Sequence, residues 1–446
     1  MPVEGPTRGD DDARRPRVVL GVAGGIAAYK ACEVLRRLTE SGHDVRVVPT
    51  RSALEFVGTA TWEALSGRPV TSEVFSEVYE VAHVRIGRDA DLVLIVPATA
   101  DLMARMVHGR ADDLLTATLL TARCPVVVVP AMHTEMWAHP ATRANVAALR
   151  ARGTVVVEPA VGRLTGADSG KGRLPEPAQV VDLAQALLRR GRQVGPDGTA
   201  AVRDLAGRRV LVSAGGTHEP LDPVRFIANR SSGRMGYALA TMAVARGAEV
   251  TVLAANVALP DPAGARVVPV QTTAELHEQV LHESGSGATG VDAVVMAAAP
   301  ADYRPAEPAR TKIKKSAHPE GLSVDLVQNT DILADLVHRR GSGGHPVLVG
   351  FAAETGDPAA VLAKGRDKLA RKGCDLLVVN DVSDGRVFGR DDTEAVVLDR
   401  DGSEQPVPPG TKIELANVIW DQVSKHLADR REARVVRGRG VRPRPV

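Results

Sequence analysis

The sequence predicts an α/β protein with two doubly wound, Rossmann-like parallel sheets. Continuous apolar runs such as DLVLIVP (91–97) and PVVVVP (125–130) are typical of short strands that are buried on both faces. Helical patterns of roughly 10–20 residues separate such runs, as in a parallel sheet with crossover helices. The same alternation recurs in the second half, and 446 residues exceed what one hydrophobic core normally holds. We therefore expect two domains.

The composition narrows the class of protein. A hydrophobic content of 44% with 25% charged residues is ordinary for a globular protein, and the net charge of +2 gives no argument for nucleic acid or a membrane surface. Cys32, Cys124 and Cys374 are too far apart for a zinc motif or a disulfide framework. No apolar run reaches about 18 residues, and the N-terminal stretch lacks the apolar core of a signal peptide. These features predict a cytoplasmic protein with no nucleic-acid or membrane partner.

The first half begins with a charged stretch, 1–16, that we expect to be a disordered leader. A strand follows at Arg17–Val22, and a glycine turn leads into a helix whose apolar face we assign to Tyr29, Val34 and Leu38. Residues 160–177 are glycine-rich and show no periodicity, which predicts a mobile loop or a lid over a site. Further strands are expected at 45–48, 91–97 and 125–130, and a helix at 180–190 completes a first domain, 17–190.

The second half repeats this alternation after a Gly-rich linker, 191–203, and forms a second domain at 204–428. Its strands are expected at 209–213, 249–254, 266–269, 293–297, 347–351 and 376–380, with a β-hairpin addition at 393–398 and before Gly410, and a closing helix at 415–428. The arginine-rich tail, 429–446, indicates either an anionic partner or a solvated disordered segment, and we expect the disordered segment.

Three loops that follow buried strands of the first half carry candidate site residues. The glycine turn 21–27 lets backbone N–H groups approach a phosphate, although a tight packing turn has the same sequence. The stretch PATAD (97–101) could hold a flat ring, or Thr99 could simply cap a helix. The stretch PAMHTEMW (130–137) combines residues that a plain loop rarely carries together, so it favours a functional loop.

The second half presents basic groups and helix starts at the ends of its strands. A glycine turn after the strand at 209–213 leads into the excursion Glu219–Asn229, which is too long for a plain connector. Asp302 follows another strand, a basic cluster begins at Lys312, and residues 329–333 begin a helix. Lys364, Lys368 and Lys372 recur every four residues, a pattern that is also usual for an exposed helix face. Together these features suit a nucleoside triphosphate with its metal, and no Walker motif is present.

The stretch AGGTHEPLDPVRFIANRSSGRMG (214–236) resembles the ligase half of the bifunctional coenzyme A biosynthesis flavoprotein, phosphopantothenoylcysteine decarboxylase/phosphopantothenate–cysteine ligase. GVAGGIAAYK (21–30), PATAD and PAMHTEMW resemble the flavin-containing cysteine decarboxylases, and the likeness covers roughly residues 17–428. The resemblance implies a flavodoxin-like first domain and a ligase second domain, which form a homo-oligomer.

For the first domain the resemblance implies FMN as cofactor and phosphopantothenoylcysteine as substrate. FMN would oxidise the substrate thiol to a thioaldehyde, which delocalises the electrons left by the departing carboxylate. The reduced flavin would then return hydride. His83 would act as acid/base in the oxidation. The implied cofactor-binding residues are Gly24, Gly25, Ile26, Thr50, Ala98, Thr99 and Ala100, and the implied substrate-binding residues are Met132, His133 and Met136.

For the second domain the resemblance implies that CTP, with Mg²⁺, activates 4′-phosphopantothenate to an acyl-cytidylate, which the amine of cysteine then attacks. Asn229 matches an asparagine that handles this intermediate, and Lys312 matches a lysine that stabilises charge on the activated phosphate. The other implied substrate-binding residues are Met296, Ala297, Ala298, Asp302, Thr330, Asp331, Ile332, Leu333, Phe351, Lys368 and Lys372, and no residue is assigned as a resident metal ligand.

Three departures from the family pattern stand in the first half. His133 occupies a position where an asparagine is common, Ala23 replaces a common serine, and the stretch Leu164–Asp168 lacks the cysteine that many members carry there. One alternative is therefore a ligase whose first half is a flavin-binding or assembly module. A two-domain NAD(P) dehydrogenase is a second alternative, but neither half has G-x-G-x-x-G followed by an acid about 20 residues on.

Overall fold

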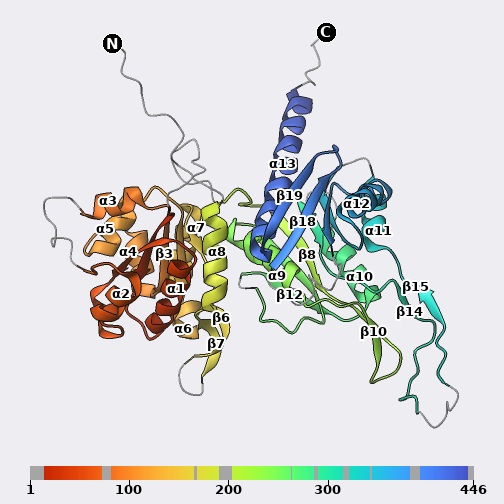
Figure 1. The fold of residues 1–446 in the computed structure, drawn as a ribbon, viewed down its shortest axis with the longest axis horizontal. Coiled ribbons are helices and arrows are strands. Elements are labelled where there is room, and N and C mark those ends of the chain that lie inside the picture. Colours follow the sequence, from red (N-terminus) through yellow and green to blue (C-terminus); the bar gives the residue numbers. More distant parts are fainter. Residues whose placement is uncertain are drawn as a thin grey trace. The chain divides into compact units, whose positions relative to one another are not determined.

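The computed structural model divides the chain into two compact units, Met1–Arg203 and Asp204–Val446, and each is described by itself (Figure 1). It describes residues 15–72, 82–164, 168–189, 203–262, 264–285, 290–314, 321–341, 344–381 and 392–439. The expected leader up to residue 14, the linker at 191–202 and the tail from residue 440 lie outside these ranges.

The first unit is built on a five-stranded, all-parallel sheet of order β2-β1-β3-β4-β5, the flavodoxin-like order. Its elements are β1 (Arg17–Val22), α1 (Ala28–Glu40), β2 (Asp44–Pro49), a 3₁₀ turn η2 (Arg51–Glu55), α2 (Thr59–Ser66), α3 (Ala82–Asp89), β3 (Leu92–Ala98), α4 (Ala100–Val107), α5 (Leu114–Thr121), β4 (Val126–Pro130), α6 (Thr134–Ala138), α7 (Pro140–Ala151), β5 (Val155–Val156), β6 (Ala160–Arg163), β7 (Ser169–Arg173) and α8 (Pro177–Arg189).

The predicted strands of this unit are confirmed, and two details differ. Val34 and Leu38 are buried as predicted, but Tyr29 is 60% exposed, because the first turn of α1 buries Ala28 instead. The stretch 160–177 is not one irregular loop: β6 and β7 pair antiparallel as a hairpin. Its glycines hide the strand pattern, because they supply no side chains to alternate.

The second unit carries an eight-stranded sheet of order β12-β11-β8-β13-β16-β17-β18-β19. The first six strands are parallel in the Rossmann order and the last two add an antiparallel hairpin, as predicted. The elements are β8 (Arg209–Gly215), β9 (His218–Pro220), β10 (Phe226–Ala228), α9 (Arg234–Ala245), β11 (Glu249–Ala255), β12 (Arg266–Val270), α10 (Thr273–Ser284), β13 (Ala293–Met296), β14 (Tyr303–Pro305), β15 (Leu326–Gln328), α11 (Ile332–Arg340), β16 (Val347–Glu354), α12 (Pro358–Lys372), β17 (Leu376–Asp381), β18 (Asp392–Asp399), β19 (Glu404–Thr411) and α13 (Lys412–Arg439).

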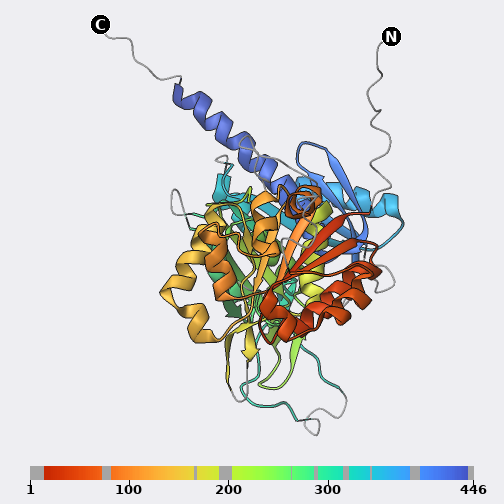
Figure 2. The ribbon, with the colours of Figure 1, turned by 90° about the vertical axis from the view of Figure 1, so that its left-hand side faces the viewer.

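Three features of this unit were not predicted. The excursion Glu219–Asn229 forms most of the β9–β10 hairpin, and β14 and β15 pair to form an arm. The closing helix α13 does not end at residue 428 but continues to Arg439, so the expectation of a disordered segment is wrong for 429–439 (Figures 1 and 2). The segment is rich in Arg, which favours helix whether or not a core supports it.

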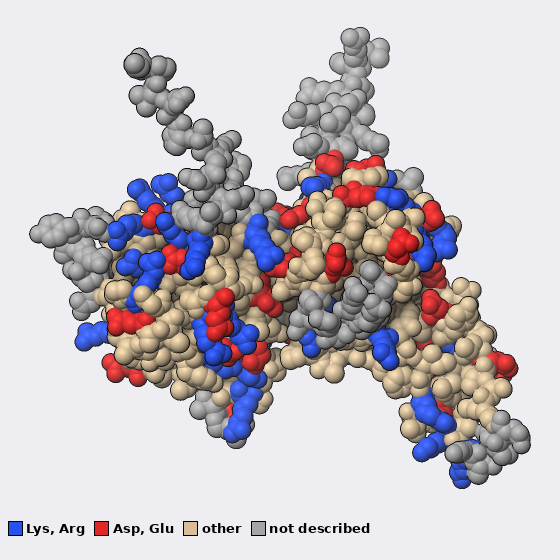
Figure 3. Space-filling view, in the orientation of Figure 1, with Lys and Arg blue, Asp and Glu red and all other residues tan. Residues whose placement is uncertain are grey.

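Within the described part of the chain, no helix combines the length and apolar character that a bilayer crossing requires. Positive and negative side chains are interspersed over the face in Figure 3.

Candidate functional site

The order of the first sheet reverses between β1 and β3, and ligands of doubly wound sheets bind where the loops diverge at such a point. The predicted phosphate turn follows β1, and PATAD follows β3. The backbone N–H of Ala23 donates to the carbonyl of Pro97 over 3.1 Å, and a Cβ added to Gly25 would lie 3.8 Å from Cγ2 of Thr99. The structure therefore brings these two stretches together at the switch point.

The residues around this turn fit a cofactor with a phosphate. A Cβ on Gly24 would lie 2.4 Å from Oγ of Ser52, so only glycine lets the backbone run this close. No side chain caps the N-terminus of α1, and Ile26 beside it is 70% exposed. An uncapped helix start offers its N–H groups to an anion.

Thr50 and Thr99, both predicted to bind the cofactor, have structural roles of their own. Thr50 is buried; its N–H donates to the carbonyl of Val22, and its hydroxyl accepts from the N–H of Ala53 at the start of η2. The hydroxyl of Thr99 accepts from the N–H of Leu102 at the start of α4, so the helix-cap interpretation of this residue is confirmed. Ala98 is buried, and Ala100 begins α4.

The loop after β4 is fixed to the β6–β7 hairpin. The N–H of Met132 donates to the carbonyl of Gly172 over 3.1 Å, and a Cβ on Gly172 would lie 2.1 Å from the carbonyl oxygen of Met132. A Cβ on Gly170 would lie 2.3 Å from Oγ1 of Thr134. The hairpin is therefore held directly against the predicted substrate loop.

His133 is the polar side chain at this junction. Its Nδ1 lies 3.1 Å from Oε2 of Glu135, and its Nε2 lies 3.8 Å from Oδ2 of Asp168, which borders the hairpin. Met136, one turn of α6 further on, is 49% exposed. The loop thus presents a histidine with two carboxylates and an exposed thioether.

His83 lies on another part of the unit, at the start of α3. The hydroxyl of Thr121 on α5 donates to its carbonyl over 2.9 Å, and α3 and α5 lie side by side in Figure 1. Nδ1 of His83 is buried without a hydrogen-bond partner among the described residues. Among the described residues, no hydrogen bond joins the His83 side chain to the glycine turn.

None of the cysteines lies on the described part of the hairpin. Cys32 is on α1, where burial raises the pKa of its thiol, and Cys124 is buried before β4. Residues 165–167 of the stretch that lacks the family cysteine lie outside the described residues.

The second sheet reverses its order between β8 and β13, and the recognised glycine stretch follows β8. Gly215 has φ +86°, and a Cβ there would lie 2.0 Å from the carbonyl oxygen of Ala255. Its carbonyl accepts from the N–H of Ala299 over 2.8 Å, which joins the two loops of the switch point. Asn229 donates through Nδ2 to the carbonyl of Pro300 over 2.8 Å, so the predicted asparagine lies against the loop that leads to Asp302.

Residues predicted to contact the nucleotide gather at the carboxyl end of the same sheet. The N–H of Asn329 donates to the carbonyl of Asp302 over 2.8 Å, which brings Thr330 next to this loop. The Asp331 side chain caps α11 by accepting from the N–H of Ala334. Ile332 and Leu333 have buried side chains, so only their backbone N–H groups are available to a ligand.

One lysine of α12 faces this helix start and another faces the end of β16. Lys372 pairs with Asp331, and Nζ of Lys368 lies 3.4 Å from Oε1 of Glu354 at the end of β16. Burial favours the neutral acid, but the hydrogen bonds from Lys372 and from the N–H of Ala334, together with the nearby positive charges, outweigh it and lower the pKa of Asp331. Both predicted lysines therefore already face a carboxylate.

The remaining predicted residues of this unit line the loops or the arm. The N–H of Ala298 donates to Oγ of Ser213 over 3.1 Å, next to Ala297 and the buried Met296, and Phe351 on β16 is half-buried. Lys312 is exposed on the segment that follows β14. In Figure 3 basic side chains gather near the end of this arm.

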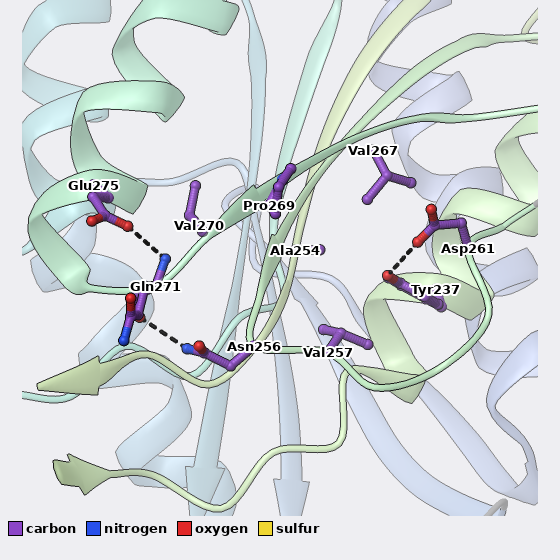
Figure 4. A pocket seen from close by; sticks show the side chains of 10 residues that line it. All are labelled: Tyr237, Ala254, Asn256, Val257, Asp261, Val267, Pro269, Val270, Gln271 and Glu275. Carbon is purple, nitrogen blue, oxygen red and sulfur yellow. Dashed lines mark hydrogen bonds between the residues drawn. The ribbon is translucent and has the colours of Figure 1, made fainter. Parts of the chain in front are cut away.

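One cavity at the sheet edge was not predicted. It has a volume of about 450 Å³ and lies between the ends of β11 and β12 and the helices α9 and α10 (Figure 4). Its polar groups already bind one another: Tyr237 donates to Asp261, and Asn256 donates to the carbonyls of Gly216 and Gln271. The sequence signal for this cavity is the asparagine directly after β11. Asparagine adopts a left-handed backbone conformation more readily than most residues, and Asn256 has φ +50°.

A buried polar network beside the glycine turn was also missed. Glu219 is 2% exposed and accepts from the N–H and the hydroxyl of Thr273. Thr217 bonds Thr273 through its hydroxyl and accepts from the N–H of Ala301. The network ties β9, α10 and the loop before Asp302 together. Among the residues described, no group of three or more His, Cys, Asp or Glu side chains is arranged to hold a metal ion.

Comparison with known proteins places each unit in a family. The family model described as DNA/pantothenate metabolism flavoprotein C-terminal domain matches residues 205–427, and the model described as Flavoprotein matches residues 7–189. These matches define a pantothenate-metabolism flavoprotein with two α/β domains.

Full-length relatives define the family more narrowly. The coenzyme A biosynthesis bifunctional protein CoaBC of Mycolicibacterium smegmatis is 58% identical over 418 residues, which cover 93% of this chain and 98% of that protein. The protein of the same name from Vibrio cholerae is 39% identical over 414 residues, which cover 92% and 98%. A crystal structure of the C-terminal domain of a CoaBC protein is 32% identical and covers 51% of this chain and 99% of that one, with a TM-score of 0.42. The chain belongs to the family of bifunctional coenzyme A biosynthesis proteins.

Proposed function

We propose that the second unit ligates cysteine to 4′-phosphopantothenate with CTP and Mg²⁺, and that the first unit decarboxylates the product with FMN to 4′-phosphopantetheine. The observation that carries the proposal is the identity to bifunctional relatives over nearly the whole chain. The convergence of the recognised motifs at the two switch points supports it. The family also supports a homo-oligomer that works in the cytoplasm.

In the ligase, a carboxylate oxygen of 4′-phosphopantothenate attacks the α-phosphate of CTP and pyrophosphate leaves. The amine of cysteine then attacks the acyl carbon of the acyl-cytidylate and CMP leaves. Lys312 neutralises charge on the activated phosphate, while Lys368, Lys372 and the N–H groups at the start of α11 hold the other phosphates. Asn229 holds the intermediate, and Asp302 with Met296, Ala297, Ala298 and Phe351 forms the rest of the nucleotide site.

In the decarboxylase, the N–H groups of Gly24, Gly25 and Ile26 hold the phosphate of FMN, with Thr50 and the stretch Ala98–Ala100 around the flavin. FMN supplies the two-electron oxidation of the substrate thiol and returns the electrons after CO₂ has left. Met132, His133 and Met136 bind the substrate, and His133 donates to its carboxylate. His83 takes the thiol proton; this role is supported by the family resemblance and by its unpartnered buried Nδ1.

The test is an assay of the purified full chain with 4′-phosphopantothenate, cysteine, CTP and Mg²⁺, after its visible spectrum has been recorded. We expect flavin absorbance, and 4′-phosphopantetheine, CO₂, CMP and pyrophosphate as products separated by mass. Accumulation of 4′-phosphopantothenoylcysteine without CO₂ would leave a ligase with a silent flavoprotein domain. Absence of CTP consumption would overturn the proposal for the second unit.

A further inference from the structure

The turn between β9 and β10 contains a buried carboxylate in exposed surroundings. Pro223, Val224 and Arg225 are exposed, but the Asp222 side chain has no exposed surface. Its Oδ1 accepts from the N–H groups of Val224 and Arg225, both at 2.8 Å. Its Oδ2 accepts from Nε and Nη2 of Arg225 at 3.0 and 2.5 Å. A carboxylate is buried at a surface turn only where such donors replace its water.

One more donor to Asp222 comes from a distant part of the chain. The N–H of Ile313, between Lys312 and Lys314, donates to Oδ2 of Asp222 over 3.1 Å. The carbonyl of Ile313 accepts from Nη2 of Arg225 over 2.8 Å. Both backbone groups of Ile313 are therefore held by the Asp222–Arg225 pair.

A second contact fixes the same two segments. The N–H of Ala309 donates to the carbonyl of Leu221 over 2.9 Å, next to Asp222. The β9–β10 turn and the segment before Lys312 are thus joined on both sides of Asp222. The chain leaves this turn through β10 and reaches Asn229 directly after it.

We propose that Asp222 is a positioning residue of the ligase, which fixes the Lys312 segment to the β9–β10 hairpin so that Lys312 and Asn229 act at one intermediate. The inference rests on the proposed function, because it assumes that Lys312 serves acyl-cytidylate formation. A lysine has a long flexible side chain, so fixing the backbone of the next residue restricts where its ammonium group can reach. In this role Asp222 acts through the backbone of Ile313 and not by contact with substrate.

The test compares Asp222→Asn, Lys312→Met and the double variant in the full-length protein. Pyrophosphate release from CTP and 4′-phosphopantothenate, without cysteine, measures formation of the acyl-cytidylate. Loss of hydrogen bonds to a charged group predicts that Asp222→Asn lowers kcat by about 10- to 100-fold. In the Lys312→Met background the same change should lower kcat by less than about 2-fold, because two residues that act through one contact are not additive.

Trypsin supplies a readout that is independent of activity. Lys312 is exposed, so release of Ile313 should speed cleavage at Lys312 and Lys314 in Asp222→Asn at least severalfold. Glu307→Gln, which changes an exposed carboxylate of the same arm, is the matched control and should alter neither cleavage nor kcat. CO₂ release from 4′-phosphopantothenoylcysteine by the first unit should stay at the wild-type rate in every variant, which confines the effect to the second unit.

The outcomes separate the inference from the function it rests on. A wild-type protein that releases no pyrophosphate would refute the proposed ligase. If the wild type is active but the effects of Asp222→Asn and Lys312→Met on kcat multiply in the double variant, positioning by Asp222 is refuted. It is also refuted if trypsin cleaves Asp222→Asn at Lys312 no faster than the wild type.

Discussion

At the scale of single residues, Asp331 makes contacts in two helices. Its carboxylate caps α11 and pairs with Lys372 of α12, so it joins two helices at the proposed nucleotide site. The two roles can be separated, because asparagine caps a helix about as well as aspartate but carries no charge. Stability measurements on two variants therefore distinguish them.

We expect Asp331→Ala to lower the stability of the second unit by about 1 kcal/mol through the lost cap. Asp331→Asn should cost only a few tenths of 1 kcal/mol, since the cap is kept and an ion pair that solvent still reaches contributes little. Calorimetry of the full chain is the measurement, and Asp367→Ala, at an exposed position of α12, is the control. Equal losses in the two Asp331 variants would show that the ion pair, not the cap, matters.

The pH dependence has a definite sign. The pKa of Asp331 is lowered in the folded protein, so its charge stabilises the fold at pH values above the unfolded pKa of about 3.9. This contribution is lost as the pH falls from there through the folded pKa. The difference in stability between wild type and Asp331→Asn should therefore be constant from about pH 5 to 7, begin to shrink near pH 4 and vanish only below the folded pKa of Asp331. A difference that grew in acid would contradict this assignment.

At the scale of elements, the β6–β7 hairpin packs directly against the substrate loop because Gly172 has no side chain. A methyl group at Gly172 would lie 2.1 Å from the carbonyl oxygen of Met132, so the backbone of the hairpin or of the loop would have to shift. We expect Gly172→Ala to lower the rate of CO₂ release by about 10²-fold, because misplacement by about 1 Å can cost that much. Pyrophosphate release by the second unit should not change.

The control for this variant is Gly58→Ala. Gly58 has φ −67°, and a Cβ there meets nothing within 4 Å, so both activities should be retained. If Gly172→Ala retained full decarboxylation with FMN bound, the hairpin would not take part in the reaction.

Elements with regular apolar patterns could be predicted from the sequence, and short glycine-rich ones could not. β1 has the predicted bounds, and β8 begins at the predicted Arg209. The hairpins β6–β7 and β9–β10 were missed, because strands of three to five residues with glycine or proline show no alternation. The end of α13 was missed because an arginine-rich segment signals both a solvated tail and a good helix.

The candidate site residues also fall into those that the sequence predicts and those that it does not. Motifs that end parallel strands were expected to converge, because all carboxyl ends lie at one edge, and the contacts at Gly25 and Asn229 agree with this. Asp222 and Glu219 were not predicted as site residues. Their roles depend on partners about 50 to 90 residues away, Thr273 and Ile313, and no local pattern encodes such partners.

At the scale of the whole molecule, each unit has its own sheet and buried core. In the second unit a fully buried arginine, Arg246 at the end of α9, joins that helix to α13. It pairs with Asp204 and Asp421 and donates to the side-chain oxygen of Asn417 over 3.0 Å. Trp420 on α13 donates to the carbonyl of Leu239 on α9, so the two helices share a buried interface.

We expect Arg246→Met to destabilise the second unit alone. Removing one partner of a buried ion pair costs about 3 kcal/mol or more, which is roughly a 6–12 °C shift for a unit of this size. Calorimetry should show the transition of the second unit shifted down, while the transition reported by flavin release stays in place. Arg366→Met is the matched control, because its pair with Glu404 is largely exposed and should cost less than about 1 kcal/mol. A common shift of both transitions in Arg246→Met would mean that the units unfold as one, and that the two activities depend on a single folded state.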